Sequence, residues 1–319
     1  MSAEPEAGGS SEGAATTRAA AAGAGTLVGV GFAAAAVLCF SLRPILVKLA
    51  YAQVTDPVTL LALRMLFSLP FFLGAALWAG RARRQAPISP RDALAMVGLG
   101  VLGYYLASYL DFLGLQYISA GLGRLVMFLY PTIVVLLSMV ALRKPVRRHE
   151  LAALVVSYAG IALVLSPAFD NTGRDLSLGA ALVFASGAIY AVYLVAGTEV
   201  VRRVGSLRFS AYATTVASLC CIAQFFVLRP ASALDLPARI YAIAAVIGVV
   251  CTALPIFMTS EALRRIGANR VAIIGALGPV STVVFAYLGL DEYLTMVQLP
   301  GAALVVGGVL LVSVPRQPR

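Results

Sequence analysis

The sequence predicts an all-α membrane protein of ten transmembrane helices, arranged as two inverted five-helix repeats. Two kinds of observation support this fold class. The 319-residue chain is 61% hydrophobic and only 12% charged, with a mean hydropathy of +0.92, whereas a soluble domain has about 25% charged residues. In addition, two halves of the chain match each other at a constant shift of 148 residues, as between Gly100 and Gly248.

The repeat keeps its apolar pattern but not its loop charges. Identical residues at equivalent positions include Leu115 and Leu263, Pro131 and Pro279, and Gly160 and Gly308. The loop pair Arg143-Lys144, by contrast, aligns with Asp291-Glu292. Units that share apolar pattern and differ in loop charge indicate opposite orientations in the membrane, an architecture found chiefly in secondary transporters.

Proline and polar residues separate ten apolar segments, each near the roughly 20 residues that a span needs. We expect helices at residues 27–48, 57–79, 92–117, 121–142, 150–166, 178–200, 209–228, 238–263, 269–288 and 294–314. The boundaries include Asp56-Pro57, residues 81–92, Pro145, residues 167–175 and Arg229-Pro230. Residues 25–167 form the first repeat, residues 168–315 the second, and residues 316–319 the C-terminus. Residues 1–24, rich in Ala, Gly, Ser and Glu, are expected to be a disordered tail.

The distribution of Lys and Arg predicts the orientation. With the N-terminus inside, 17 of the 24 basic residues fall in inner segments, 4 in outer segments and 3 within spans. This bias predicts that both termini are cytoplasmic and that the chain lies in the cytoplasmic (inner) membrane. It also explains the net charge of +10 without nucleic acid as a partner.

Neither a metal site nor a cofactor is expected. The four cysteines, Cys39, Cys220, Cys221 and Cys251, fall in apolar runs, and His149 is the single histidine of the chain. Metal binding and nucleophilic catalysis require clusters of such side chains, so enzymatic activity is not expected. The expected partners are a small-molecule substrate and the lipid bilayer; the oligomeric state stays open, with a monomer as one option.

Four charged residues are candidates for positions deep within spans, away from a cytoplasmic end: Arg43, Arg64, Asp111 and Arg124. Each costs roughly 2.5–3.5 kcal/mol on insertion scales, so such side chains tend to face a cavity or a partner. Asp111 and Arg124 lie on adjacent helices, both roughly 7–10 Å below the outer turn, which predicts an ion pair between them. The pair either takes part in transport or only neutralises two buried charges. Arg43, nearer the outer surface, is expected to extend to it.

Arg64 has no obvious acidic partner. A desolvated guanidinium binds carboxylate or phosphate through paired hydrogen bonds, so Arg64 is a candidate for recognising an anionic group of the substrate. Capping of a backbone carbonyl, or extension of the side chain to the membrane surface, are the alternatives.

Polar stripes suggest where the substrate passes. Tyr104, Ser108 and Asp111 share one helical face, and the repeat shift sends the first and last of them to Thr252 and Thr259. We expect these faces to line a shared cavity; hydrogen bonding between helices is the alternative. Tyr190 and Tyr193 form, with Ser186, a similar stripe that lines the cavity or packs between helices.

Pro131 and Pro279 are expected to kink their helices at equivalent positions, because each removes a backbone hydrogen bond. Together, the cavity predicted from sequence consists of Arg64, Tyr104, Ser108, Asp111, Arg124, Tyr190, Tyr193, Thr252 and Thr259.

Several short motifs resemble EamA-type members of the drug/metabolite transporter superfamily. They are Ser119-Ala120-Gly121, Tyr130-Pro131-Thr132, Gly267-Ala268-Asn269, Gly278-Pro279-Val280 and Gly289-Leu290-Asp291-Glu292, together with Arg64 in the second helix. One departure is Lys144, which replaces the acidic residue that often ends the fourth helix. The resemblance implies two EamA repeats, a central cavity and alternating access, and many relatives export amino acids or other small metabolites.

The sequence therefore predicts a secondary transporter, and favours an exporter of amino-acid-like or other carboxylate-bearing compounds. An efflux carrier for neutral or cationic drug-like compounds is the alternative within this class. A membrane-embedded lipid-modifying enzyme would need converging catalytic side chains, and a sensor would need a further soluble domain. Asp111 is the one deep carboxylate that could carry a proton, and exchange or facilitated diffusion remain equally open.

Overall fold

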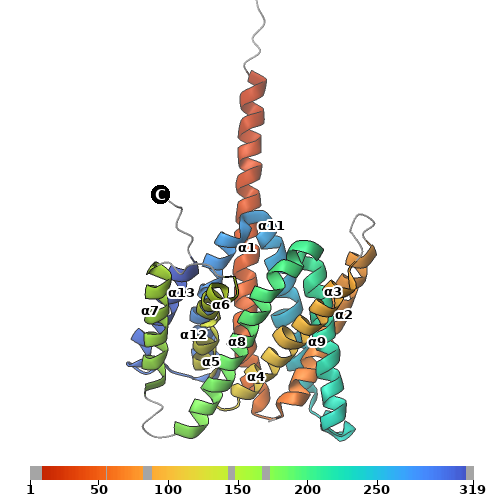
Figure 1. Ribbon diagram of the computed structural model, residues 1–319, viewed down its shortest axis with the longest axis vertical. Helices are drawn as coiled ribbons and strands as arrows, with labels where there is room; N and C mark the ends of the chain where they lie inside the picture. Colours follow the sequence, from red (N-terminus) through yellow and green to blue (C-terminus); the bar gives the residue numbers. More distant parts are fainter. Residues whose placement is uncertain (1–8, 55, 82–87, 143–147, 167–172, 314–319) are drawn as a thin grey trace, which may run out of the picture.

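The computed structural model of the chain describes residues 9–54, 56–81, 88–142, 148–166 and 173–313. Within these ranges all regular structure is helical, and the helices form one bundle (Figure 1). Eight helices in the described ranges are long and apolar enough to cross a membrane, and two shorter apolar helices, Leu151–Leu165 and Gln298–Leu311, accompany them. The predicted all-α membrane fold is confirmed.

Five spans form the first repeat. They are α1 (Gly9–Tyr51), α2 (Pro57–Arg81), a third span built from α3 (Pro90–Gly100), the π-helical segment η1 (Val101–Leu106) and α4 (Ala107–Gly114), a fourth built from α5 (Ala120–Met127) and α6 (Tyr130–Leu142), and α7 (Arg148–Leu165). Short polar side chains begin several of these helices: Asp56 accepts a hydrogen bond from the N–H of Thr59 at 2.9 Å, and Ser119 from that of Leu122 at 3.2 Å. Such caps satisfy N–H groups of the first helical turn.

The second repeat follows the same plan. It comprises α8 (Gly173–Val204), α9 (Ser206–Leu228), the short 3₁₀ helix η3 (Ala231–Leu234), a third span of α10 (Ala238–Gly248), η4 (Val249–Ala253) and α11 (Leu254–Gly275), then α12 (Leu277–Leu290) and α13 (Gln298–Ser313). α11 contains a break at Gly267, whose φ is 77°. By the repeat shift, α1 corresponds to α8, α2 to α9 and α7 to α13.

The repeats share their irregularities as well as their helices. The π-helical segments begin at Val101 and Val249, and the fourth spans are interrupted after Met127 and Gly275. The shift of 148 residues relates the members of both pairs. Because π-helical turns are uncommon, their presence at equivalent positions indicates that the two units share the same local backbone structure.

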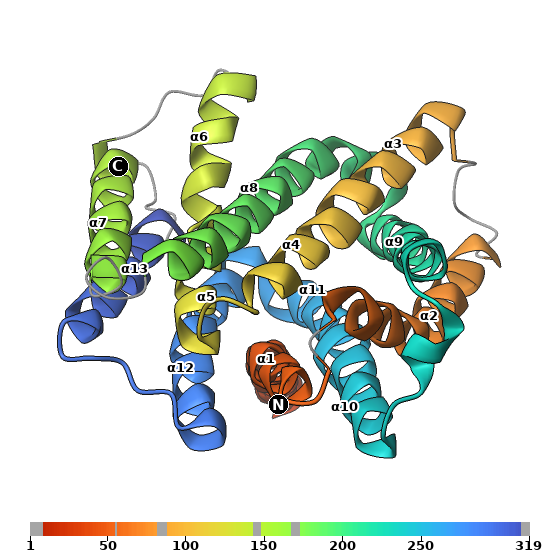
Figure 2. The same cartoon turned by 90° about the horizontal axis from the view of Figure 1, so that it is seen from below.

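The two repeats interlock. α1 packs against α11 and α12, whereas its counterpart α8 packs against α4, α5 and α6. α2 packs against α9, and α7 packs against α13. In Figure 1, α1 runs down the view and α8 runs up, so these equivalent spans have opposite directions. Seen from below in Figure 2, α1, α4, α8 and α11 lie near the centre, between the α7–α13 pair and the α2–α9 pair.

Two glycines bring the helices around Arg64 into close contact. A β-carbon at Gly248 would lie 2.5 Å from the carbonyl oxygen of Arg64, and one at the equivalent Gly100 would lie 2.5 Å from that of Ala213. Both obstacles are backbone atoms, so no rotation of a side chain makes room for them. Glycine at these positions therefore sets how closely the second helix of each repeat approaches the other repeat.

The structure corrects two expectations about the helices. Residues 9–24, expected to be a disordered tail, continue α1 beyond the bundle (Figure 1), while residues 1–8 lie outside the described part. Alanine has the highest helix propensity, and a packed span provides the nucleus from which the helix extends. Residues 269–275 follow the break at Gly267 inside α11 and so begin the ninth span, as expected. The last helix, however, begins at Gln298 rather than at residue 294.

Candidate substrate site

A buried ion pair connects the first and third spans. Arg43 on α1 donates to Asp111 on α4, with 3.0 Å between Nη2 and Oδ2. The two side chains are 16% and 8% exposed. The pair compensates both charges and connects α1 with α4, although Nε of Arg43 is also buried without a hydrogen-bond partner.

This pairing corrects the prediction from sequence. Asp111 pairs with Arg43 rather than Arg124, and Arg43 points to this partner rather than to the membrane surface. The prediction compared depths along two consecutive helices. It left out the rotation of each helix about its axis and the position of α1, which packs against α5 in the middle of the bundle (Figure 2).

Arg64 is a fully enclosed cation on α2. Arg64 is 2% exposed. Its Cζ lies 5.3 Å from the ring centroid of Phe112. Its Nε and Nη1 atoms are buried and have no hydrogen-bond partner. Because Arg64 is buried, its side chain does not extend to the membrane surface. The attraction between the guanidinium and the ring of Phe112 offsets only part of the free energy lost when the guanidinium leaves water.

Arg124 on α5 is a second cation without a full set of partners. Its Nε is buried without a hydrogen bond. A β-carbon at Gly278 would lie 3.7 Å from its Nη2 and 3.9 Å from Oγ of Ser41, and Ser41 donates to the carbonyl of Gly278 at 3.0 Å. The guanidinium of Arg124 therefore lies where α1, α5 and α12 meet.

These four charged residues influence one another. Arg43 and Asp111 both act electrostatically on Arg64 and on Arg124. Three guanidiniums thus share one carboxylate, and arginine stays protonated in proteins. We call these four residues the arginine cluster. Its excess positive charge makes the centre of the bundle favourable for an anion.

A row of tyrosine rings lies beside this cluster. Ring centroids are 5.1 Å apart between Tyr104 and Tyr193, 5.7 Å between Tyr193 and Tyr190, and 5.2 Å between Tyr190 and Tyr130. Tyr104 is in electrostatic range of Arg64, and Tyr130 and Tyr190 are in range of Arg124. The row, formed by η1, α8 and α6, therefore extends from the surroundings of one arginine to those of the other.

The predicted stripe of the third span is divided by its π-helical segment. Tyr104 lies in η1 and faces Tyr193, whereas Ser108 and Asp111 lie in α4. The π-turn changes the rotation per residue, so positions that a regular helix would align diverge. Ser108 is half-buried, and on the facing helix Ser186 donates to the carbonyl of Ala107 at 2.6 Å.

Among the described residues, no hydrogen bond joins Thr252 or Thr259 to the arginine cluster. Thr252 is buried and donates to the carbonyl of Ile247 in its own span at 2.8 Å. Thr259 is half-buried on α11, which packs against α1, while α4 packs against α8. The third span of each repeat thus packs against the first span of the other, and the hydroxyl of Thr252 is bound to a backbone carbonyl of its own span.

The two prolines begin helices rather than kink them. Pro131 is the second residue of α6 and Pro279 the third of α12. Their missing N–H groups fall in first turns, where no backbone acceptor is available in any case. In place of the expected kinks, the structure has helix interruptions just before Pro131 and Pro279, at equivalent positions of the two repeats.

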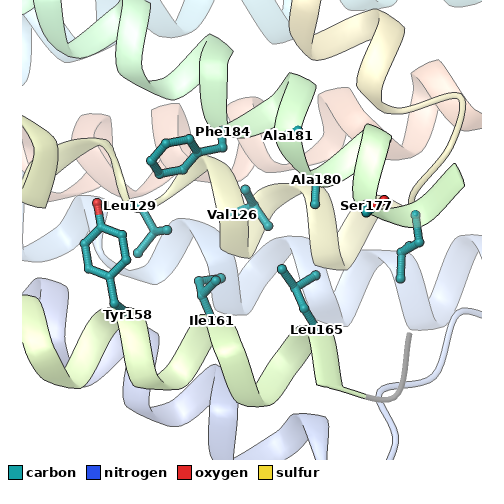
Figure 3. Close-up of a pocket in the computed structure, with 10 residues that line it drawn as sticks. Val126, Leu129, Tyr158, Ile161, Leu165, Ser177, Ala180, Ala181 and Phe184 are labelled. Carbon is teal, nitrogen blue, oxygen red and sulfur yellow. The ribbon is translucent and has the colours of Figure 1, made fainter. Parts of the chain in front are cut away.

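A cavity of about 290 Å³ lies away from the arginine cluster (Figure 3). It is bounded by α5, α7, α8 and the turn between α5 and α6. Its mostly apolar lining comprises Val126, Leu129, Tyr158, Ile161, Leu165, Leu176, Ser177, Ala180, Ala181 and Phe184. None of the nine residues expected to line a substrate cavity is among them; those nine lie elsewhere in the packed bundle.

Two residues outside the nine predicted ones complete the site. Phe112 covers the guanidinium of Arg64, and Tyr130 extends the tyrosine row toward Arg124. Phe112 directly follows Asp111, and Tyr130 directly precedes Pro131. Adjacency to a buried charge and to a helix break is the signal that could have identified them.

Each half of the chain matches one protein family. The model of the EamA-like transporter family matches residues 27–166 and again residues 177–314. The chain belongs to the EamA-like transporter family. The two matches coincide with the two repeats, so the repeat in the sequence and the repeat in the fold are the same unit.

Similar proteins agree with this assignment. The chain is 30% identical to the uncharacterized transporter YcbK of Bacillus subtilis (strain 168), over 86% of this chain and 88% of YcbK. It is 24% identical to the uncharacterized transporter YyaM of the same organism, over 70% and 74% of the two chains. A crystal structure with 19% identity and a TM-score of 0.61 covers 91% of this chain and 96% of its own, and shares the fold. The protein is therefore a multi-pass membrane transporter.

Proposed function

We propose that this transporter moves a small organic anion, and that it exports amino-acid-like or other carboxylate-bearing compounds across the cytoplasmic membrane. The observation behind the proposal is the excess of positive charge in the arginine cluster. Arg64 and Arg124 both have buried nitrogen atoms without a hydrogen-bond partner, and the single carboxylate of the cluster pairs with Arg43.

The energetics favour an anionic ligand. An uncompensated buried charge is strongly unfavourable, and a partner of opposite sign with well-placed hydrogen bonds offsets that cost. The planar guanidinium matches the two oxygens of a carboxylate. A substrate carboxylate at Arg64 or Arg124 would supply both the missing charge and the missing acceptors.

The proposed transport cycle uses the inverted repeats. In alternating access, one repeat rocks against the other around a site near the middle of the membrane. The cluster lies where elements of both repeats meet, since α12 reaches Arg124 and α8 supplies half of the tyrosine row. With both termini in the cytoplasm, as the basic residues predict, the inner and outer loops would close the site alternately.

Transport by the purified chain in liposomes tests the proposal. Vesicles loaded with labelled amino acids and organic acids should release at least one of them, with and without a pH gradient. Arg64→Gln and Arg124→Gln should each reduce this flux, whereas Arg239→Gln, at an exposed residue of α10, should not. Size-exclusion chromatography checks that each variant is folded.

Two results would contradict the proposal. One is the absence of flux for every carboxylate-bearing compound. The other is flux of a cationic dye such as ethidium that survives both arginine substitutions, which would instead favour the carrier of cationic drug-like compounds.

A further inference from the structure

We infer that the transported substrate is a dianion with two separate acid groups, of the dicarboxylate class, one group for Arg64 and one for Arg124. The inference rests on the proposed function, because it names the substrate class of the same site. Its starting point is the charge of the cluster, which one negative group cannot balance.

The ion pair with Asp111 accounts for only one of the three guanidiniums. Asp111 gives its carboxylate to Arg43 at 3.0 Å, and Arg64 and Arg124 form no ion pair with any described residue. Both keep their charge at every physiological pH. A ligand with one negative charge would therefore leave one buried guanidinium uncompensated, whereas a ligand with two would leave none.

The two uncompensated arginines have different surroundings. Arg64 lies on α2 beneath Phe112, and Arg124 lies on α5 beside Gly278. Arg43 acts electrostatically on both. Because the cations come from separate helices with the Arg43–Asp111 pair in range of each, two acid groups at the ends of one molecule suit them better than a single phosphate head.

The tyrosine row supplies a surface for the body of such a molecule. Its rings extend from Tyr104, in range of Arg64, to Tyr130, in range of Arg124. Ring faces pack against a short carbon chain or an unsaturated body, and phenolic hydroxyl groups can donate to a carboxylate. The row thus connects the two positions that the acid groups would occupy.

Matched probes that differ by one charge test the inference. Glutarate and its monoamide have nearly the same shape, but the monoamide has one carboxylate instead of two. In liposomes containing the full chain, glutarate should be transported on the order of tenfold to a hundredfold better than the monoamide, the ratio that one charged hydrogen bond supplies. Phenyl phosphate, a dianion with a single head, should be transported less well than glutarate.

Substitution of either arginine should then reverse the preference. Arg124→Gln and Arg64→Gln should each lose glutarate transport while keeping or gaining transport of the monoamide. Arg124→Lys, which retains the charge, should keep the preference for glutarate, and this distinguishes a charge effect from misfolding. Arg239→Gln serves as the unaffected control.

The outcomes separate the two proposals. If only monocarboxylates are transported, or if both probes are transported equally and each arginine variant reduces them alike, the dianion inference is overturned and the anion proposal stands. If phenyl phosphate exceeds glutarate, separate acid groups are wrong. If no anionic probe is transported by the wild-type chain, the proposed function itself fails.

Discussion

The two repeats have the same backbone plan but differ in charge. Their π-helical segments and helix breaks fall at equivalent positions. Yet the residues of the arginine cluster, Arg43, Arg64, Asp111 and Arg124, correspond to Ala191, Tyr212, Thr259 and Ala272 in the second repeat. Symmetry of the backbone thus requires only the apolar pattern and the glycines and prolines. Charges can be confined to one repeat because the shared backbone plan does not require them at the equivalent positions of the other.

The N-terminal end of α5 and its counterpart in the second repeat also differ in charge. The N–H groups of Ala120 and Gly121 donate to the carboxylate of Glu292 at 3.2 and 3.3 Å. The position equivalent to Ser119 is Gly267, with a φ of 77°, and Lys144, the equivalent of Glu292, lies outside the described residues. A carboxylate from the second repeat therefore holds the first repeat at one end of the bundle.

The largest expected effect comes from removing the negative charge of the cluster. Asp111→Asn leaves three guanidiniums without a carboxylate, and breaking a buried pair costs about 3–5 kcal/mol. We expect a large drop in the unfolding temperature of the purified protein and loss of transport. The equivalent substitution in the second repeat, Thr259→Ala, should have a small effect. Recovery of stability in the Asp111→Asn/Arg43→Gln double variant would support the pairing; no recovery would contradict it.

The second effect concerns the space beside Arg124. A leucine at Gly278 would collide with Arg124 and Ser41, and overpacking of this kind costs about 1–3 kcal/mol. Gly278→Leu should therefore lower both stability and anion transport. Gly275→Ala is the matched control, because a β-carbon there meets no atom within 4 Å. Wild-type transport rates in Gly278→Leu would show that Arg124 does not need this position.

A smaller effect is expected at the N-terminal end of α5. Glu292→Gln removes the charge that binds two free N–H groups at a helix start, an interaction worth about 0.5–2 kcal/mol. The substitution should lower thermal stability modestly and increase hydrogen exchange at Ala120 and Gly121. Asp291→Asn, at the neighbouring exposed residue, is the control, and equal exchange in both variants would argue against the contact.

The smallest effect should come from the exposed link between the repeats. Arg229 donates to Asp56 at 2.7 Å. Partial burial works to raise the pKa of the Asp56 carboxyl, but the hydrogen bonds from Arg229 and Thr59 outweigh it and hold that pKa below its usual value. The pair therefore stabilises the fold at neutral pH, and this contribution is lost as the pH falls through the lowered pKa. Unfolding temperatures of wild type and Asp56→Asn should differ slightly at pH 7 and converge in acid; a difference that persists in acid would exclude this origin.

Much of the fold could be predicted from particular residues. The shift that relates Gly100 to Gly248 and Pro131 to Pro279 identified the repeats, and apolar length identified the spans. The site was predicted less well: Arg64 is buried and Arg124 is half-buried, and each has a buried nitrogen atom without a hydrogen-bond partner. The partner of Asp111 was missed because helix depth follows from residue counting, whereas rotation about the helix axis depends on π-turns and on neighbours far away in the chain.

The sequence by itself determined the membrane location, the two repeats and the excess of arginine over carboxylate deep within the spans, because hydropathy, periodicity and charge are properties of local residues. Only the tertiary structure decided that Arg43 pairs with Asp111, that Phe112 covers Arg64 and that Gly278 makes room for Arg124. These contacts join residues from different spans and, at Gly278, from different repeats. Their existence depends on how the helices interlock, which no local pattern specifies.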